Sequence, residues 1–212
     1  MSSLAVSGAL LPALLAGWGL ARARFPGRGA LALILYLPIV MPPVATGFVL
    51  LLLFGRAGPI GALLARAGIH LPFTTAGAAL ACGTMIFPVL VRTARLAFEQ
   101  ADPALDAAAR SLGAGRSDRL FSVALPLAAP GVLAGIALAY ATSLGEFGAV
   151  ITFAASIPGQ TETLPLAIYG ALQQPGGESA AARLAAVSIV LAIAGLAVAE
   201  WAARHLNRTR GL

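Results

Sequence analysis

The residues that could carry catalytic or metal chemistry are few in this 212-residue chain. All fourteen basic residues are arginine, so the chain has no P-loop lysine, no Schiff-base lysine and no Ser-x-x-Lys pair. Cys82 is the single cysteine, which excludes an internal disulfide and a CxxC metal or redox site. His70 and His205 are isolated and do not form a zinc site with Cys82. We therefore predict no catalytic residue, no metal site and no cofactor bound by this chain.

The composition is that of a membrane protein. Charged residues make up 10% of the chain, against about 25% in soluble domains. Hydrophobic residues make up 59%, and the mean hydropathy is +0.89, which also excludes disorder. A soluble protein with so few charges would expose large apolar patches. The net charge of +6 is carried by arginines beside predicted membrane ends, so we expect contact with anionic lipid and none with nucleic acid.

Five segments are long and apolar enough to cross a bilayer, which requires about 20 residues each. We predict transmembrane helices near residues 3–20, 31–54, 73–96, 130–154 and 183–203. Prolines within these segments are tolerated, because neighbouring helices satisfy the carbonyls that they free. The predicted fold class is an all-α membrane protein, a polytopic bundle of about five transmembrane helices in a single domain over residues 1–212.

The arginines are distributed unequally between the two sides of the predicted bundle. Eleven of the fourteen lie in the 21–30 loop, the 92–128 loop and the C-terminal tail. By the positive-inside rule that side is cytoplasmic, so the N-terminus lies outside and the C-terminus inside. A cleaved signal peptide is the alternative for the first span, but Met1-Ser2-Ser3 lacks the basic residues of such a segment.

The longest polar segment, Glu99–Ser122, lies on the predicted cytoplasmic side, within a loop that we place at about residues 99–128. Asp102 and Pro103 suit the N-cap and first position of a helix that ends at Gly113. We expect a second short segment to end at Leu125-Pro126, where the chain returns to the membrane. An ordinary connecting loop is the alternative, although a short alanine-rich helix bounded by glycine and proline is unusual for a connector.

This segment resembles the EAA loop of ABC-importer permeases, whose pattern is Glu-Ala-Ala, three residues, Gly, nine residues and Ile-x-Leu-Pro. Here Ala107-Ala108-Ala109 is followed at the same spacings by Gly113 and Val123-Ala124-Leu125-Pro126. Ala107 stands where the family has glutamate, and Asp106 lies one residue earlier, about 100° away around a helix. The resemblance implies that a coupling helix docks on an ATPase subunit through Asp106, Ala107, Ala108, Ala109, Gly113, Leu125 and Pro126.

The resemblance extends over nearly the whole chain and is to the molybdate permeases. Residues 37–47, 53–61, 143–149 and 157–169 are similar to segments of that family. The Gly145-Glu146-Phe147-Gly148 element is shared with sulfate permeases, whereas the Ile-Pro-Gly-x-Thr run at 157–161 points to molybdate. The resemblance implies the type I (MetI-like) ABC importer permease fold in the inner membrane and ATP-driven import of molybdate. Sulfate, thiosulfate and tungstate remain alternative substrates.

Glu146 is the only ionisable residue well inside a predicted span. Carboxylates in a membrane are costly and face a cavity, an interface or a partner. Three roles are open: Glu146 caps the helix end that glycine breaks, pairs across a dimer interface or gate, or contacts the substrate. Thr142 and Ser143 offer hydroxyls for the same path or gate, although such hydroxyls more often bond the preceding turn.

The resemblance also implies a complex. A second copy would complete the translocation path on a two-fold axis, and two ABC ATPase subunits that hold ATP and Mg would dock on the cytoplasmic side. A periplasmic or extracellular molybdate-binding protein would dock on loops 55–72 and 155–182. A secondary transporter is less favoured, because the sequence has no repeated halves with midplane carboxylates. A membrane enzyme is disfavoured by the lack of a nucleophile–base pair.

Overall fold

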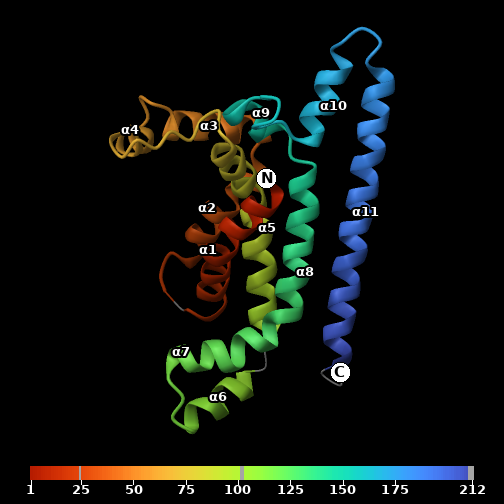
Figure 1. The fold of residues 1–212 in the computed structure, drawn as a ribbon. Helices are drawn as coiled ribbons and strands as arrows, with labels where there is room; N and C mark the ends of the chain where they lie inside the picture. Colours follow the sequence, from red (N-terminus) through yellow and green to blue (C-terminus); the bar gives the residue numbers. More distant parts are fainter. Residues whose placement is uncertain (24, 101–102, 210–212) are drawn as a thin grey trace.

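The computed structural model describes residues 1–23, 25–100 and 103–209, and their regular structure is entirely helical. The predicted all-α class is therefore confirmed. The helices, in chain order (Figure 1), are α1 (Ser2–Arg22), α2 (Arg28–Val40), α3 (Pro43–Phe54), α4 (Pro59–Arg66), α5 (Thr75–Gln100), α6 (Pro103–Ser111), α7 (Arg116–Asp118), the π-helix η1 (Arg119–Ala124), α8 (Leu125–Leu144), α9 (Gly148–Ala154), α10 (Leu164–Leu172) and α11 (Glu178–Thr209).

Four helical segments of the described chain are long and apolar enough to cross a membrane, and a bent pair of helices is a fifth candidate. The four are Ser2–Arg22, Thr75–Gln100, Arg119–Leu144 and Glu178–Gly195. The bent pair is α2 and α3, whose axes differ by 114°. This agrees with the prediction of about five transmembrane helices.

The prediction of one uninterrupted span over 31–54 is wrong, because α2 ends at Val40 and α3 begins at Pro43. Met41 and Pro42 between them have extended backbone, with ψ of 145° and 133°. Each precedes a proline, whose ring disfavours helical conformation in the residue before it. Two consecutive prolines therefore turn the chain inside an apolar segment.

The predicted span 130–154 is also wrong in its bounds. Helical backbone runs without interruption from Arg119 to Leu144, and α9 is a separate helix that begins at Gly148. The expected return of the chain at Leu125-Pro126 occurs within helical conformation, since Leu125 has φ −67° and ψ −45°. Its amide donates to the carbonyl of Leu120, five residues back. Such a wide turn accommodates Pro126, which lacks an amide hydrogen.

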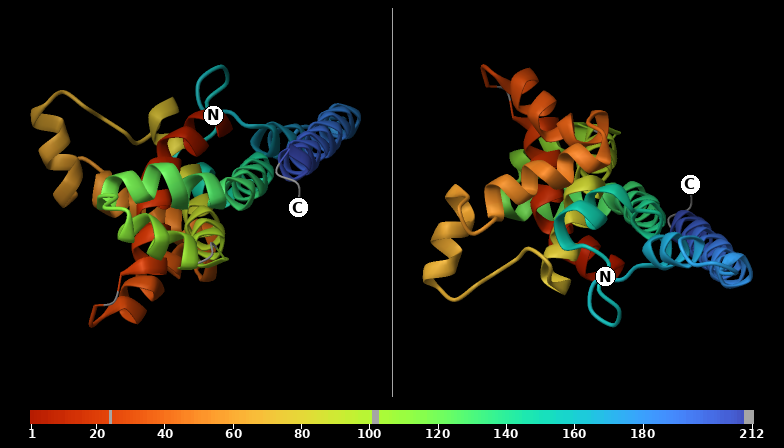
Figure 2. Two further views of the ribbon diagram at one scale, coloured as in Figure 1. Left: turned by 90° about the horizontal axis from the view of Figure 1, so that it is seen from below. Right: turned by 90° about the horizontal axis from the view of Figure 1, so that it is seen from above.

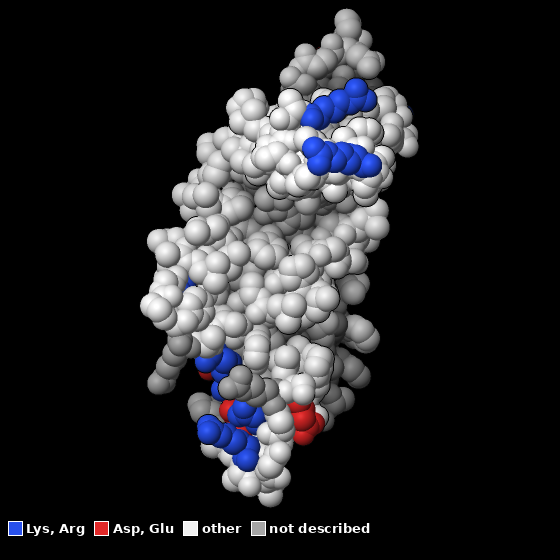
Figure 3. Space-filling model, turned by 90° about the vertical axis from the view of Figure 1, so that its left-hand side faces the viewer, with Lys and Arg blue, Asp and Glu red and all other residues white. Residues whose placement is uncertain are grey.

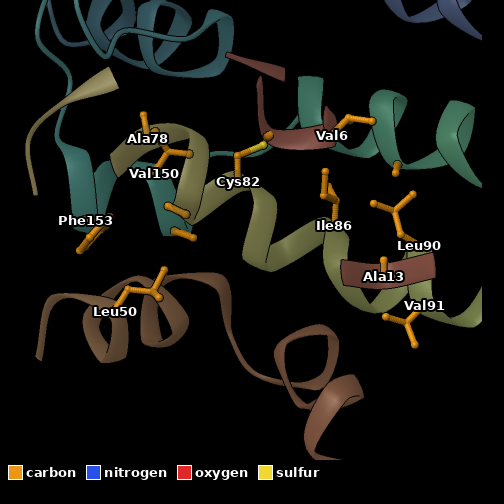
Figure 4. Close-up of a cluster of buried hydrophobic side chains, with 14 of the residues drawn as sticks. Val6, Ala13, Leu50, Ala78, Cys82, Ile86, Leu90, Val91, Val150 and Phe153 are labelled. Carbon is orange, nitrogen blue, oxygen red and sulfur yellow. The ribbon is translucent and has the colours of Figure 1, made fainter. Parts of the chain in front are cut away.

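Helix α5 lies at the centre and packs against α1, α2, α8 and α9, while α11 stands at one flank beside α8 and α10 (Figures 1 and 2). The main core gathers side chains from α1, α3, α5 and α9 (Figure 4). Many of its buried residues are alanine, which allows helices to approach closely. Its labelled members in Figure 4 are Val6, Ala13, Leu50, Ala78, Cys82, Ile86, Leu90, Val91, Val150 and Phe153.

Helix α1 lies close to α5 at Gly17. A Cβ atom added to Gly17 would lie 2.8 Å from Cβ of Ala94 and 2.9 Å from the backbone nitrogen of Arg95. The second of these atoms belongs to a helix backbone and cannot turn away. Glycine is therefore required at this position by packing.

We expect Gly17→Ala to destabilise the protein by about 1–3 kcal/mol, because the added methyl overpacks the α1–α5 contact. Gly19 is the matched control on the same helix, since a Cβ there has no neighbour within 4 Å. Gly19→Ala should leave stability unchanged or raise it by up to about 1 kcal/mol through helix propensity. Thermal unfolding in detergent measures both, and equal effects of the two substitutions would contradict the packing argument.

Charged side chains gather at the two ends of the molecule, and a broad, almost uncharged band separates them on the face shown in Figure 3. One end carries α6, α7 and the end of α11, and the other carries α4, α9 and α10 (Figure 1). Ala23, just after α1, lies at the α6 end, because it lines the same cavity as Asp106. The arginine-rich segments of the described chain therefore meet at one end.

Candidate functional site

The first candidate site is α6, the helix in the predicted coupling loop. Pro103 is its first residue, as the sequence predicts, whereas the proposed N-cap Asp102 lies outside the described residues. After the helix, Gly113 has φ +85°, and its amide donates to the carbonyl of Arg110 at 3.1 Å. Ala114 closes the turn through its amide, which donates to the carbonyl of Ala109 at 3.0 Å. Glycine is favoured at this left-handed position, so it ends the helix sharply.

Asp106 points toward this chain's own η1 helix. Its Oδ2 accepts a hydrogen bond from Nη1 of Arg119 at 2.9 Å, in a partly buried ion pair. Ala107, at the position of the family glutamate, is exposed. The carboxylate of Asp106 thus holds α6 against η1. Asp106 is less exposed than Ala107, so its carboxylate does not lie where the family glutamate would be.

The outward face of α6 is apolar. Leu105 is 47% exposed and Leu112 is 88% exposed, and Ala108 between them is also exposed. These residues follow the i, i+3, i+7 spacing of one helix face. Our reading of the sequence missed both leucines, although this spacing could have indicated them. An apolar face on a loop helix is typical of a surface that contacts another protein.

The remaining predicted coupling residues lie apart from this face. Leu125 is half-buried and packs against a small second core, whereas Pro126 is exposed at the start of α8. That core consists of Ala94, Ala97, Phe98, Ala124 and Ala128. Leu125 therefore contributes to the packing of α8 on α5.

The second candidate site is Glu146, in the break between α8 and α9. Glu146 is buried, with 8% of its surface exposed. Its Oε1 accepts a hydrogen bond from the amide of Ala149 at 2.9 Å. The first amides of a helix have no partner within the helix, and a carboxylate at that end also interacts favourably with the helix dipole. This geometry is that of the first of the three alternatives, the cap of a broken helix.

The hydroxyls of Thr142 and Ser143 both bond the preceding turn. Thr142 Oγ1 donates to the carbonyl of Leu138 at 2.8 Å, and Ser143 Oγ donates to the carbonyl of Tyr140 at 2.7 Å. Ser143 and Glu146 line the same small cavity of about 170 Å³, whereas Thr142 is exposed elsewhere on α8. The structure thus brings Ser143 and Glu146 together and leaves Thr142 apart.

Thr161 gives the Ile-Pro-Gly-x-Thr motif a structural reason that the sequence did not reveal. Its side chain is fully buried, accepts the amide of Ile157 at 2.9 Å and donates to the carbonyl of Ala155 at 3.0 Å. Ala155 has φ +56° and ψ −174°, a strained conformation for a residue other than glycine. Thr161 therefore closes the loop that follows α9 over a strained residue.

The amino-acid sequence is similar to those of known transport proteins. The family model described as "Binding-protein-dependent transport system inner membrane component" matches residues 13–210. The molybdenum transport system permease protein ModB of Escherichia coli K12 is 50% identical over 211 residues, covering 99% of this chain and 92% of the relative. ModB of Haemophilus influenzae is 43% identical over 213 residues, with 99% and 93% covered. The sulfate transport system permease protein CysT of E. coli K12 is 38% identical over 181 residues, with 84% and 65% covered.

The fold is similar to that of solved ABC transporters. A chain of a bacterial alginate ABC transporter, in complex with an alginate pentasaccharide-bound periplasmic protein, superposes with a TM-score of 0.74 at 17% identity, covering 96% of this chain and 76% of that one. A chain of an amino acid ABC transporter gives 0.64 at 20% identity, with 96% and 88% covered. At these identities the likeness concerns the fold alone, and it confirms the predicted ABC transporter permease fold.

Proposed function

This chain belongs to the family of binding-protein-dependent transport system inner membrane components, and we propose that it is the permease subunit of an ATP-driven importer of molybdate. The observation that carries the substrate is the 50% identity to E. coli ModB over 211 residues. The 38% identity to the sulfate permease CysT covers a shorter part of the chain and makes sulfate the second candidate. As a family member the chain is a membrane permease subunit and not itself a catalytic enzyme.

In this proposal the arginine-rich end that carries α6 faces the cytoplasm, as the positive-inside rule requires. The N-terminus then lies outside and the C-terminus inside. The opposite end, which carries α4 and α10 in loops 55–72 and 155–182, receives the binding protein. Both of those helices lie at the same end in Figure 1, which supports a common docking surface.

The exposed face of α6 receives the ATPase subunit. Ala108 allows close approach, and the exposed Leu105 and Leu112 supply apolar surface to bury in that contact. The Asp106–Arg119 ion pair then connects α6 to η1, which continues into α8 without a break. The 26-residue helix Arg119–Leu144 is roughly 39 Å long, so a displacement of α6 reaches the Glu146 break at its far end.

A second copy of the chain completes the translocation path, and ATP and Mg are held by two ATPase subunits. The candidate path residues offer little to bind a dianion tightly, because the hydroxyls of Thr142 and Ser143 bond their own helix and Glu146 is acidic. A weakly binding path suits release of the cargo. Selectivity for molybdate therefore resides mainly in the binding protein.

Reconstitution in liposomes with the ATPase subunit and the binding protein tests this function. We expect molybdate-loaded binding protein to stimulate ATP hydrolysis more than the sulfate-loaded form does, with the ATPase subunit alone as the control. Equal stimulation by the two forms would contradict the molybdate assignment. No stimulation by either form would contradict the importer assignment.

A further inference from the structure

A cavity of about 640 Å³ lies at the α6 end of the molecule, between the end of α1, helix α6 and the π-helix η1. It is separate from the outward face of α6 that we assign to the ATPase. Among the described residues, three arginines line it, and each comes from a different element: Arg22 from α1, Arg110 from α6 and Arg119 from η1. Asp106 is the carboxylate that lines it within the same part of the chain. Side chains far apart in sequence thus converge on a basic cavity.

Arg119 has a hydrogen-bond donor without an acceptor. Its Nη1 donates to Asp106, but its Nε is buried and has no hydrogen-bond partner within the part of the chain that the structure describes. A buried donor left unsatisfied costs about 1–3 kcal/mol, and more when the group is charged. This unsatisfied donor belongs to the guanidinium group of Arg119, a residue that lines the cavity.

The chemistry of the lining favours an oxyanion such as phosphate. Guanidinium groups carry only donors, arranged in a fork that matches phosphate oxygens. Asp106 accepts a hydrogen bond from Arg119, and it forms no ion pair with Arg110 within the described residues. A phosphate group placed here would accept hydrogen bonds from the guanidinium groups of Arg110 and Arg119.

The position and size of the cavity favour a lipid as the source of the phosphate. Trp18 lines the cavity near the end of the apolar helix α1, and tryptophan is enriched at the membrane–water interface. Basic pockets between transmembrane helices on the cytoplasmic side bind anionic headgroups. The cavity volume of about 640 Å³ is large enough for a whole lipid headgroup and larger than a bare phosphate ion needs.

We propose that this cavity binds the phosphate of an anionic phospholipid headgroup, which bridges Arg110 and Arg119 and holds α6 against the end of α1. The same chemistry would accept free inorganic phosphate, and the test separates the two sources. In this proposal, only the placement of the cavity on the cytoplasmic side rests on the orientation proposed above. The test uses neither molybdate nor the ATPase, so its failure and the failure of the transport assignment are distinguishable.

Fluorescence of Trp18 in the full chain reports on the cavity directly. The chain has two tryptophans, so the Trp201→Phe background leaves Trp18 as the only one. Protein in neutral detergent is titrated with phosphatidylglycerol, with phosphatidylcholine and with inorganic phosphate. We expect a saturable shift of Trp18 emission and a raised midpoint of thermal unfolding with phosphatidylglycerol alone.

Two substitutions distinguish binding at this site from non-specific attraction between the anionic lipid and the basic protein. Arg110 is exposed on α6, so Arg110→Gln should preserve the fold and weaken phosphatidylglycerol binding about tenfold through loss of one charge-assisted contact. Arg56→Gln removes an equal charge at the opposite end and should leave binding unchanged. The alternative outcome is that inorganic phosphate shifts the Trp18 emission as much as the lipid does, with the shift lost in Arg110→Gln. That result would show that the cavity binds an anion and would overturn the lipid as the source of the phosphate. No saturable shift, or equal effects of the two substitutions, would overturn the site.

Discussion

The Ala108→Trp variant is expected to insert into the membrane normally and to lose most of its ATP-driven molybdate uptake. Ala108 is exposed on the outward face of α6, between Leu105 and Leu112 and away from the Asp106–Arg119 ion pair. Because Ala108 is exposed, a large ring there can extend into solvent. If this face docks on the ATPase as we propose, the ring would hold the helix away from the ATPase surface.

The size of the effect follows from overpacking at a close contact. Such a change costs about 1–3 kcal/mol, which corresponds to a loss of roughly five- to 150-fold in affinity for the ATPase subunit. Co-purification of the ATPase with the permease and uptake into proteoliposomes measure the two consequences. Thermal unfolding of the permease alone should not change.

Ala108→Ser is the matched control, since it keeps a small side chain at the same exposed position. It should retain uptake and binding of the ATPase. If Ala108→Trp also retains both, the outward face of α6 is not the docking surface. Loss of thermal stability in the tryptophan variant would instead show that Ala108 faces the interior of the chain.

Replacing Glu146 distinguishes its three possible roles. The Oε1 atom accepts the amide of Ala149, a residue with no exposed surface. Glu146→Leu leaves that amide buried and unpaired, at a cost of about 1–3 kcal/mol. Glu146→Gln keeps an oxygen acceptor of the same shape but removes the negative charge.

If Glu146 acts as the cap of α9, Glu146→Gln should keep stability and uptake close to those of the unsubstituted protein. Glu146→Leu should lower the stability by about 1–3 kcal/mol and reduce uptake, because the start of α9 loses its cap. Thermal unfolding in detergent and uptake into proteoliposomes are the measurements. Equal losses of uptake in both variants, with stability retained in Glu146→Gln, would favour a charge-dependent pairing or gate over the cap.

The membrane class, the family resemblance and the position of helix α6 could be predicted from the sequence, and the comparisons confirm the first two. Hydropathy is a sum along the chain, and in a bilayer each helix must satisfy its own backbone, so apolar length predicts spans well. Gly113 could also be predicted as the end of α6, because the need for a left-handed residue is local. The spans 31–54 and 130–154 were wrong because hydropathy does not register a break inside an apolar segment.

Composition and spacing thus determined by themselves that the chain spans a membrane, that it lacks the lysine of a nucleotide-binding loop and where its loop helix ends. Only the tertiary structure decided what the polar side chains contact. Asp106 meets Arg119 thirteen residues later, and Arg22 reaches the cavity of Arg110. Helix formation depends on hydrogen bonds between near neighbours in the chain. These contacts depend on how the ends of separate helices come together, and no local pattern of residues encodes that.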